Sequence, residues 1–460
     1  MRQSHSTGAM PDHVFDCIGV GFGPSNIALA IAMEETGFLD NVLFLEAQAG
    51  PSWHPGMMLT GTDIQHNPLR DFVTPRNPQS PYGFLSYLKA KNRLFDFLNL
   101  DAPYPPRTEY AGYVEWVAAQ FADFVRWGTP VETIEAVQHE VHGPLTRIVA
   151  NGETYLARTL SFGTGRSALV PKIFQPHAGD RLIHLNDYLP SLERWISEGV
   201  RRIVVIGGSQ SAAEIILDIA GRGAGIEVTG ISRRFGFKLK DLSPFTERIY
   251  MPEFVDYFFG APEAEQNEIT RELWRSNYGA ADHDVIAALN MLLYEQKVTG
   301  QEAVRILFNA GITRLSPLAS GGFALDLVER GTGTTSRVTA DAIILATGYR
   351  NFGDGEEQEP FHPLLAGLAP QAAYRSDGGV AVARDFGMVF RPDAGPMPAV
   401  FLNGVCESSH GFGDAGSFSL LSTRSSLITA SIEAICRPGV PVSAASGNGG
   451  THAAAPSLAV

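Results

Sequence analysis

Cysteine is scarce in this sequence, which has only Cys17, Cys406 and Cys436 among its 460 residues. Three scattered cysteines cannot form a disulfide framework, a zinc site or a redox CxxC pair, and we expect no metal site. This small number of thiols fits a reducing compartment, and the sequence therefore predicts a cytoplasmic protein.

The sequence also lacks a long apolar run and an excess of basic residues. No segment reaches the roughly 18 apolar residues that a membrane span needs, and residues 1–12 lack the apolar core of a signal peptide. Lys and Arg number 35 against 49 Asp and Glu, which gives a formal net charge of −14 with His neutral. We therefore expect neither a nucleic acid nor a membrane as a partner.

The composition otherwise fits a globular protein. Hydrophobic residues make up 44% and charged residues 18%, which argues against a mainly disordered chain. At about 150 residues per domain, the length predicts two to four domains. The ends differ, because 1–12 is polar and 438–460 is rich in small residues, Pro and Gly. Both are expected to be disordered tails.

A strand, a glycine-rich turn, a helix and a second strand follow one another near the N-terminus. The apolar pattern predicts a buried strand at 15–18 and a helix at 26–35. The strand predicted after this helix ends in the acidic residue Glu46. Glycines let the backbone turn and approach a pyrophosphate, while the acid can bind an adenosine ribose. The alternative is a hinge with a solvated acid. The predicted nucleotide site comprises Gly19, Gly21, Gly23, Pro24, Ser25, Asn26 and Glu46.

A second, less regular unit of this kind begins at Arg201. Its strand is predicted at 203–206 and its helix at 211–221, with a serine where glycine is commoner in the turn. The next strand ends in two arginines, and guanidinium groups suit the 2′-phosphate of NADPH. The alternative is an exposed basic loop. The predicted second site comprises Gly207, Ser209, Gln210, Ser211, Arg233 and Arg234.

Two such units predict an α/β fold with two Rossmann-like dinucleotide-binding domains and a small helical substrate domain. The first unit suits FAD or NAD and the second NADPH, so we expect NADPH to reduce a flavin. Without a CxxC pair, the electrons pass to an external carrier or to O2. The expected domains are an FAD domain at 13–180 and 351–437, an NADPH domain at 181–244 and 302–350, and a helical insertion at 245–301.

Several segments, in order along the chain, carry a resemblance to a known family. They include GVGFGPSNIALAIA, SWHPGMMLTGTDIQHNPLRDF, YPPRTEYAGYVEW, VVIGGSQSAAEI, SPFTERIYMPEF, SNYGAADHDVI, DAIILATGYR and HGFGDAGSFSLLSTRS. With these segments the sequence resembles the flavin-dependent N-hydroxylating monooxygenases, the L-ornithine and L-lysine N-monooxygenases of hydroxamate siderophore biosynthesis. The ornithine branch is the more similar.

The resemblance implies that NADPH reduces FAD and that O2 then gives a C4a-hydroperoxyflavin. A neutral primary amine attacks this group and becomes a hydroxylamine. The flavin carries the chemistry, while Gln65 and Asn277 assist positioning. A homo-oligomer, dimer or tetramer, is also implied. The alternatives are a Baeyer–Villiger-type oxygenase or flavin reductase, and a nucleotide-binding sensor without activity.

The resemblance also assigns residues to the cofactors. Trp53, His54 and Gln65 should border the flavin, although the first two could be ordinary core residues. Arg107 should lie near the flavin or the nicotinamide, unless it forms an interdomain salt bridge. The remaining expected cofactor residues are Thr347, Tyr349 and Asp414, and the alternative for the first two is a plain turn after a strand.

The substrate residues depart from the family pattern. Arg70 stands where the ornithine enzymes have a Lys that holds the substrate carboxylate, and Glu247 replaces an Asn, while Asn277 is retained. The segment around Ser419 is one residue longer than expected. These changes predict an altered amine pocket for a diamine, another basic amino acid or a specialised amine. The alternative is that Glu247 pairs with Arg70 and L-ornithine still binds.

Overall fold

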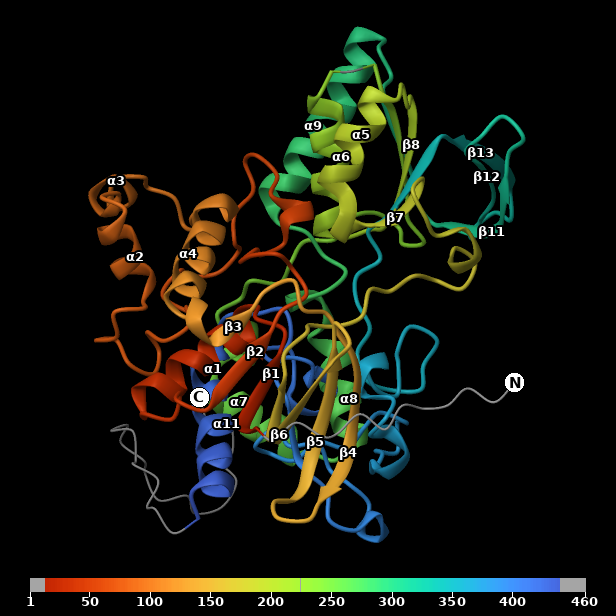
Figure 1. Ribbon diagram of the computed structural model, residues 1–460. Coiled ribbons are helices and arrows are strands. Elements are labelled where there is room, and N and C mark those ends of the chain that lie inside the picture. Colours follow the sequence, from red (N-terminus) through yellow and green to blue (C-terminus); the bar gives the residue numbers. More distant parts are fainter. Residues whose placement is uncertain (1–12, 224, 439–460) are drawn as a thin grey trace.

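The computed structural model describes residues 13–223 and 225–438, so the predicted tails, apart from Pro438, lie outside the described residues. Two sheets occupy separate lobes (Figure 1). The first sheet has the order β3-β2-β1-β6-β5-β4, with β15 beside β6. Its strands are β1 (Val14–Val20), β2 (Val42–Leu45), β3 (Val125–Arg126), β4 (Val131–His139), β5 (Gly143–Ala150), β6 (Glu153–Phe162) and β15 (Ala399–Leu402).

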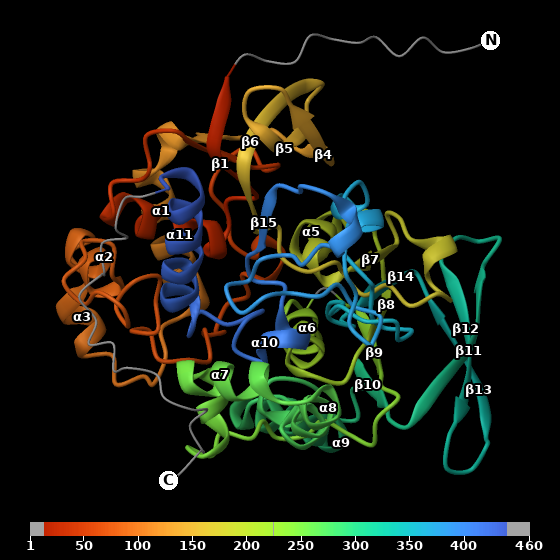
Figure 2. The same ribbon diagram turned by 90° about the horizontal axis from the view of Figure 1, so that it is seen from below.

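The helices of this lobe cover the sheet and extend to one side of it. Helix α1 packs between the sheet and α11, as Figure 2 shows. Eight of its twelve residues are buried, because the run from Asn26 to Met33 is almost wholly apolar. The helices are α1 (Pro24–Glu35), α2 (Phe84–Ala90), α3 (Leu94–Leu98), α4 (Arg107–Gln120), α10 (Glu407–His410) and α11 (Leu421–Cys436).

The second sheet is entirely parallel and has the order β10-β9-β8-β14-β7. Short apolar strands such as Arg202–Ile206 suit a parallel sheet, because both of its faces are covered. The elements are β7 (Leu182–His184), β8 (Arg202–Ile206), β9 (Glu227–Ile231), β10 (Val304–Leu307), β14 (Ala342–Leu345), α5 (Tyr188–Ser197) and α6 (Gln210–Gly221). Both predicted strand–turn–helix–strand units are therefore confirmed, with the first strand and the helix of each extended by one or two residues and β2 ending one residue before Glu46.

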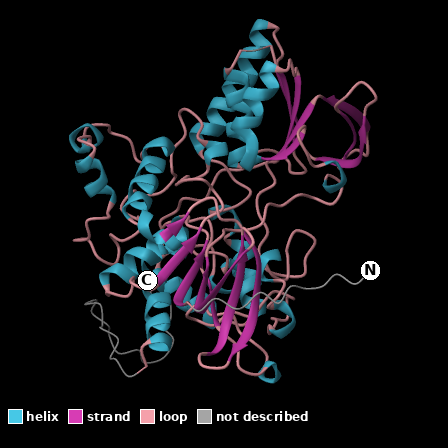
Figure 3. Cartoon of the chain, viewed as in Figure 1, coloured by secondary structure: helices cyan, strands magenta, loops and turns pink. Residues whose placement is uncertain are grey.

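A three-stranded antiparallel sheet lies beside the second sheet (Figure 3) and was not predicted. It consists of β11 (Ala310–Pro317), β12 (Phe323–Glu329) and β13 (Thr335–Ala340). The predicted helical block contains α7 (Pro252–Gly260), α8 (Glu263–Glu272) and α9 (His283–Thr299). Helix α9 packs on α6, whereas α7 packs on α10, so the block touches both lobes.

Candidate cofactor and substrate site

The first glycine-rich turn leads from β1 into α1. Gly21 has a φ of +82°, and a Cβ there would lie 2.8 Å from the carbonyl oxygen of Gly163, so the turn requires glycine. Gly23 is the N-cap of α1, where no side chain caps the helix and a Cβ would meet no atom within 4 Å. The first helical turn carries no acidic residue. This cradle with free N–H groups fits the pyrophosphate of FAD.

Three residues predicted to contact this nucleotide also hold the turn. The fully buried Asn26 donates to two carbonyl oxygens of the turn at 3.2 and 2.7 Å. Glu46 accepts from two backbone N–H groups at 2.6 and 2.8 Å, and Ser25 Oγ accepts from Arg424 at 2.9 Å. Asn26 can therefore reach a cofactor only through its backbone, while the Glu46 carboxylate has lone pairs left for a ribose.

The second glycine-rich turn leads from β8 into α6. A Cβ at Gly207 would lie 2.5 Å from the carbonyl oxygen of Ala346, so only glycine lets the two segments pack this closely. Ser209 is the N-cap of α6, but its hydroxyl makes no capping bond, and the first turn has no acidic residue. The second turn therefore offers an N-terminus that also fits phosphates.

The two predicted 2′-phosphate residues follow β9, which runs parallel to β8 and ends beside the second turn. Arg233 forms an ion pair with Glu357, whose carboxylate lies 2.5 Å from its Nη1. Arg234 donates to the carbonyl oxygen of Gly279 at 3.4 Å. Burial and then the neighbouring Arg233 lower the pKa of Arg234. Both arginines thus follow the end of β9, as the sequence predicted. Arg233, however, is already paired with Glu357.

A chain of hydrogen bonds joins the two lobes between the turns. Gln65 donates to the Asp282 carboxylate, and the backbone N–H of Asp282 donates to Gln210 Oε1 at 2.8 Å. Gln210 Nε2 in turn donates to Glu214 Oε1 at 2.9 Å, and Glu214 pairs with Arg107. Three predicted cofactor residues therefore meet through Asp282 and Glu214, which were not predicted.

Arg107 forms the interdomain salt bridge that was the alternative to its predicted cofactor contact. Its Nη2 lies 2.9 Å from Glu214 Oε1, and the side chains are 13% and 4% exposed. It also donates to the carbonyl oxygen of Met57 at 2.9 Å. Glu214 follows Gln210 by one helical turn, so spacing was the available signal for it, whereas for Asp282 the only signal was its place in the SNYGAADHDVI segment.

The loop predicted to border the flavin has an unusual backbone. His54 and Gln65 have φ values of +48° and +59°, whereas four of the other five described non-glycine residues with positive φ are Asn or Asp. Such conformations cost roughly 1–3 kcal/mol each and tend to persist at functional sites. The loop also buries Met57 in the hydrophobic core of the second lobe. It therefore joins the two lobes where the cofactors should meet.

Aromatic rings pack around this loop. Trp53 meets the edges of His54 and Phe418, with ring centroids 5.1 and 5.4 Å apart, and His66 stacks on Phe418 at 5.6 Å. Burial lowers the pKa of His66 to about 4, so its imidazole is neutral at pH 7. Trp53 and His66 are half-buried, whereas the His54 side of the loop is exposed.

Some buried polar atoms near this loop have no hydrogen-bond partner within the described residues. They are His66 Nε2, the Tyr110 hydroxyl oxygen and Asp282 Oδ1. An unpaired buried polar atom costs free energy, so such atoms often mark a place where a ligand or water completes the bonding. Together with the two glycine turns, they show that this part of the chain fits bound dinucleotides.

A buried ionic cluster that the sequence did not indicate lies between the lobes. Arg166 donates to Tyr278 and Asn351, each at 2.8 Å, and lies 3.6 Å from Glu407. Asn351 and Tyr278 both donate to Glu407. Burial raises the pKa of Glu407, although Arg166 opposes this. The cluster fixes Tyr278, which adjoins the predicted substrate residue Asn277.

The last three predicted cofactor residues make protein contacts. Thr347 donates to the carbonyl oxygen of Leu169, and Tyr349 donates to Asn186 at 2.6 Å. Asp414 forms a buried ion pair with Arg424 at 2.6 Å. Arg424 also donates to Ser25 in the first turn. Asp414 therefore supports that turn indirectly, by holding Arg424.

The predicted substrate residues mostly come together. Arg70 Nη1 lies 3.4 Å from Glu247 Oε2, and its guanidinium lies over the ring of Tyr250 at 6.0 Å. The Tyr250 hydroxyl donates to Asn277 Oδ1 at 3.2 Å. Ser419 is buried and is held by Ser417, with no recorded contact to the other three. The lengthened segment instead places Phe418 in the aromatic cluster.

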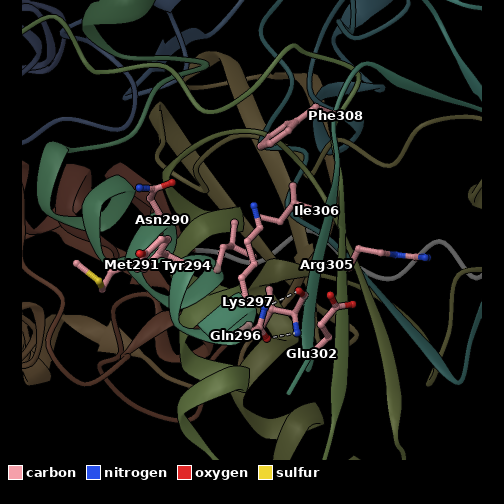
Figure 4. Close-up of a pocket in the computed structure, with 11 residues that line it drawn as sticks. Asn290, Met291, Tyr294, Gln296, Lys297, Glu302, Arg305, Ile306 and Phe308 are labelled. Carbon is pink, nitrogen blue, oxygen red and sulfur yellow. Dashed lines mark hydrogen bonds between the residues drawn. The ribbon is translucent and has the colours of Figure 1, made fainter. Parts of the chain in front are cut away.

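A cavity of 390 Å³ opens elsewhere, between α9 and β10 (Figure 4). Gln296 ties these elements together by bonds to the backbone of Val304 at 2.7 and 2.9 Å. Tyr294, Lys297 and Phe308 line the cavity, but none of the predicted site residues does. It is therefore separate from the dinucleotide turns.

Within 13–223 and 225–438, no group of three or more His, Cys, Asp or Glu side chains is arranged to hold a metal ion. No helix in these same ranges has both the length and the apolar character of a membrane span.

Comparisons with known proteins agree with this geometry. The family model for L-lysine 6-monooxygenase/L-ornithine 5-monooxygenase matches residues 13–351. An L-ornithine N(5)-monooxygenase of Burkholderia cepacia is 36% identical over 412 residues, which cover 86% of this chain and 90% of that protein.

Solved structures are similar over most of the chain. An ornithine N-hydroxylase of Kutzneria sp. 744, solved with reduced FAD, NADP+ and L-ornithine, superposes with a TM-score of 0.83 at 29% identity. The match covers 92% of this chain and 99% of that one. A cadaverine monooxygenase of Erwinia amylovora, solved with FAD, gives a TM-score of 0.78 at 28% identity, covering 92% and 95%.

Proposed function

Because the chain belongs to the L-lysine 6-monooxygenase/L-ornithine 5-monooxygenase family, we propose that it N-hydroxylates the side-chain amine of L-ornithine. It is a flavin-dependent monooxygenase that uses FAD, NADPH and O2. When bound and reduced by NADPH, FAD would supply the activation of O2, which gives one oxygen atom to the amine and the other to water. The hydroxylamine product suits siderophore biosynthesis or another pathway to an N–O metabolite.

The chain supplies binding and orientation. The cradle at Gly21 and Gly23 holds the FAD pyrophosphate, and the α6 N-terminus with Arg233 holds the NADPH phosphates. The loop of Trp53 and Gln65, packed against Phe418, would cover the bound cofactors and limit the access of water to them. Exclusion of water also favours the neutral amine, which is the reactive form.

The ion pair between Arg70 and Glu247 is the observation that supports an amino-acid substrate. A single contact of 3.4 Å leaves Glu247 Oε1 and the other guanidinium N–H groups of Arg70 without a recorded partner in the described residues. An amino acid carries a carboxylate and an ammonium group on one carbon. The carboxylate can bind Arg70 while the ammonium binds Glu247, so the pair matches this charge pattern.

A diamine is the second candidate, and Glu247 favours it. A carboxylate in place of an asparagine can hold the ammonium group at the far end of a chain whose other amine reacts. One solved relative is a cadaverine monooxygenase. The two candidates differ in their need for Arg70, because an amino acid uses both members of the ion pair whereas a diamine uses Glu247 alone.

Product assays separate these candidates. Hydroxylamine would be measured with L-ornithine, L-lysine, putrescine and cadaverine in the presence of FAD, NADPH and O2. We expect L-ornithine to give the highest kcat/KM. We expect Arg70→Ala to raise its KM by roughly tenfold or more, because a charge-assisted bond is lost, while the rate of NADPH oxidation changes less.

Arg337→Ala is the matched control, because Arg337 is an exposed arginine paired with Asp326 on the β12–β13 hairpin. It should leave every KM unchanged. A diamine enzyme would show the opposite pattern, with putrescine or cadaverine preferred, Arg70→Ala harmless and Glu247→Gln damaging. That pattern would replace L-ornithine by a diamine as the substrate.

We also propose that the protein acts in the cytoplasm and as a homo-oligomer, a dimer or tetramer. The exposed apolar side chains of Met291, Tyr294 and Val298 on α9 form a face that a second copy could cover. Light scattering of the FAD-loaded protein measures the oligomeric state directly, and a monomer at all concentrations would contradict the proposal.

A further inference from the structure

Arg233 is held by an acid from another part of the chain. Its Nη1 and Nη2 donate to the two carboxylate oxygens of Glu357 at 2.5 and 3.0 Å. Arg233 follows β9 in the second lobe, whereas Glu357 lies in the loop that leads from β14 back to the first lobe. The contact therefore uses the whole donor fork of the arginine and both oxygens of the acid.

A phosphate monoester and a carboxylate bind an arginine fork in the same way. The hydrogen bond from Arg233 is the main cause that lowers the pKa of Glu357, with further contributions from Arg234 and Arg350. Glu357 is therefore ionised at neutral pH. A phosphate and this carboxylate cannot share the fork without bringing two negative groups together.

The loop around Glu357 has its own supports, so the carboxylate stays near the arginine. Arg350 donates to the carbonyl oxygen of Gln358 at 2.8 Å, and Gln358 Oε1 accepts from the backbone N–H of Gly355 at 3.1 Å. Arg234, by contrast, forms no ion pair with an acid in the described ranges 13–223 and 225–438. The acid is thus directed at one of the two arginines.

We propose that Glu357 is a specificity-determining residue that competes with the cofactor's 2′-phosphate for Arg233. This inference rests on the proposed role of Arg233 in binding that phosphate. A ligand with a 2′-phosphate must displace Glu357, whereas a ligand without one leaves the ion pair intact. Glu357 therefore weakens the binding of NADPH but leaves the binding of NADH unchanged. It thereby reduces the preference for NADPH over NADH.

The test measures ligand binding and needs no turnover. Calorimetry with the FAD-loaded protein would compare 2′,5′-ADP with 5′-ADP. We expect Glu357→Gln to lower the Kd for 2′,5′-ADP roughly three- to fivefold, the upper part of the range for an exposed ion pair. The Kd for 5′-ADP should stay within about twofold of the unmodified protein, because that ligand does not meet Arg233.

Glu356→Gln is the matched control, because it removes the same charge from the same loop without touching the fork. If both variants lower the Kd for 2′,5′-ADP equally, the effect comes from net charge and the proposal is wrong. An unchanged Kd for 2′,5′-ADP in Glu357→Gln would also overturn it. Arg233→Ala tests the underlying premise. If it leaves the preference for 2′,5′-ADP intact, the phosphate role of Arg233 fails, and the competition fails with it.

Discussion

The two glycine-rich turns differ in where their supporting contacts come from. The first turn is held from within its own lobe, since Asn26 binds its carbonyl oxygens and Arg424 supports Ser25. The second turn is held from outside, because Gln210 receives a hydrogen bond from Asp282 and Arg233 pairs with Glu357. Both turns join a strand to the N-terminus of a helix through glycines. Only the second turn depends on contacts from outside its own domain.

This difference predicts how the two cofactor sites respond to change. A site built from local contacts forms whenever its own domain folds, whereas a site built from interdomain contacts also needs the correct domain arrangement. FAD binding should therefore survive damage to the contacts between the lobes. NADPH binding should weaken with that damage, even where no altered residue touches the nucleotide.

Gly21→Ala should have the largest effect and should act on FAD alone. The φ of +82° disfavours any side chain, and the Cβ would lie 2.8 Å from the carbonyl oxygen of Gly163, so the turn must move. We expect at least a hundredfold weaker FAD binding, on the order of 3 kcal/mol from strain and lost contact. Flavin absorbance per mole of purified protein measures the loss.

Gly23→Ala separates loss of the cofactor from loss of the fold. A Cβ at Gly23 meets no atom within 4 Å, so the apoprotein should unfold at the same temperature as the unmodified protein. FAD binding should nevertheless weaken, because the methyl group takes the space that the pyrophosphate needs. Normal flavin content in this variant would refute the assignment of this turn to FAD.

Asp282→Ala should have an intermediate effect and should act on NADP+ rather than on FAD. It removes the acceptor of the Gln65 amide and loosens the segment that donates to Gln210. We expect about a tenfold higher Kd for NADP+, close to the loss of one buried charge-assisted hydrogen bond. Titration of the flavin absorbance with NADP+ measures it.

Asp284→Ala is the control, because Asp284 is exposed two residues further along α9. It should leave both cofactors bound as before. If Asp282→Ala releases FAD as readily as it weakens NADP+, then the first site also depends on the contact between the lobes, and the contrast drawn above is wrong.

The sequence predicted what depends on nearby residues. The strand–turn–helix units follow from apolar runs and glycines within some 30 residues, and the structure confirms both. Two alternatives that the sequence analysis left open are also present, namely the interdomain salt bridge of Arg107 and the pairing of Arg70 with Glu247. In each case one partner was a charged residue within a recognisable segment.

Apart from the pair of Arg70 and Glu247, which the family pattern brought to attention, the sequence did not predict contacts whose partners lie far apart along the chain. Gln65 and Asp282 are separated by 217 positions, and Tyr278 and Glu407 by 129. No local pattern pairs such residues, because only the folded lobes bring them together.

The last expected effect is on stability rather than on cofactor binding, and it concerns acid and the loop that joins the lobes. Burial is the main cause that lowers the pKa of His66 to about 4, with smaller contributions from Arg70 and Lys240. In the unfolded chain an imidazole has a pKa of about 6.5. Between these values the unfolded state binds a proton that the folded state does not, so the free energy of unfolding falls as pH falls from 6.5 towards 4.

His66→Phe isolates this contribution, because phenylalanine keeps the stacking on Phe418 and cannot take up a proton. Comparison with a variant is needed, since buried carboxylates with a raised pKa, such as Asp71, gain stability in acid. Denaturant unfolding at pH 7 and pH 4.5 should show the unmodified protein losing at most about 2–3 kcal/mol relative to His66→Phe. An equal response of both proteins would mean that His66 is protonated in the folded state at pH 4.5, so that its burial would not lower the imidazole pKa.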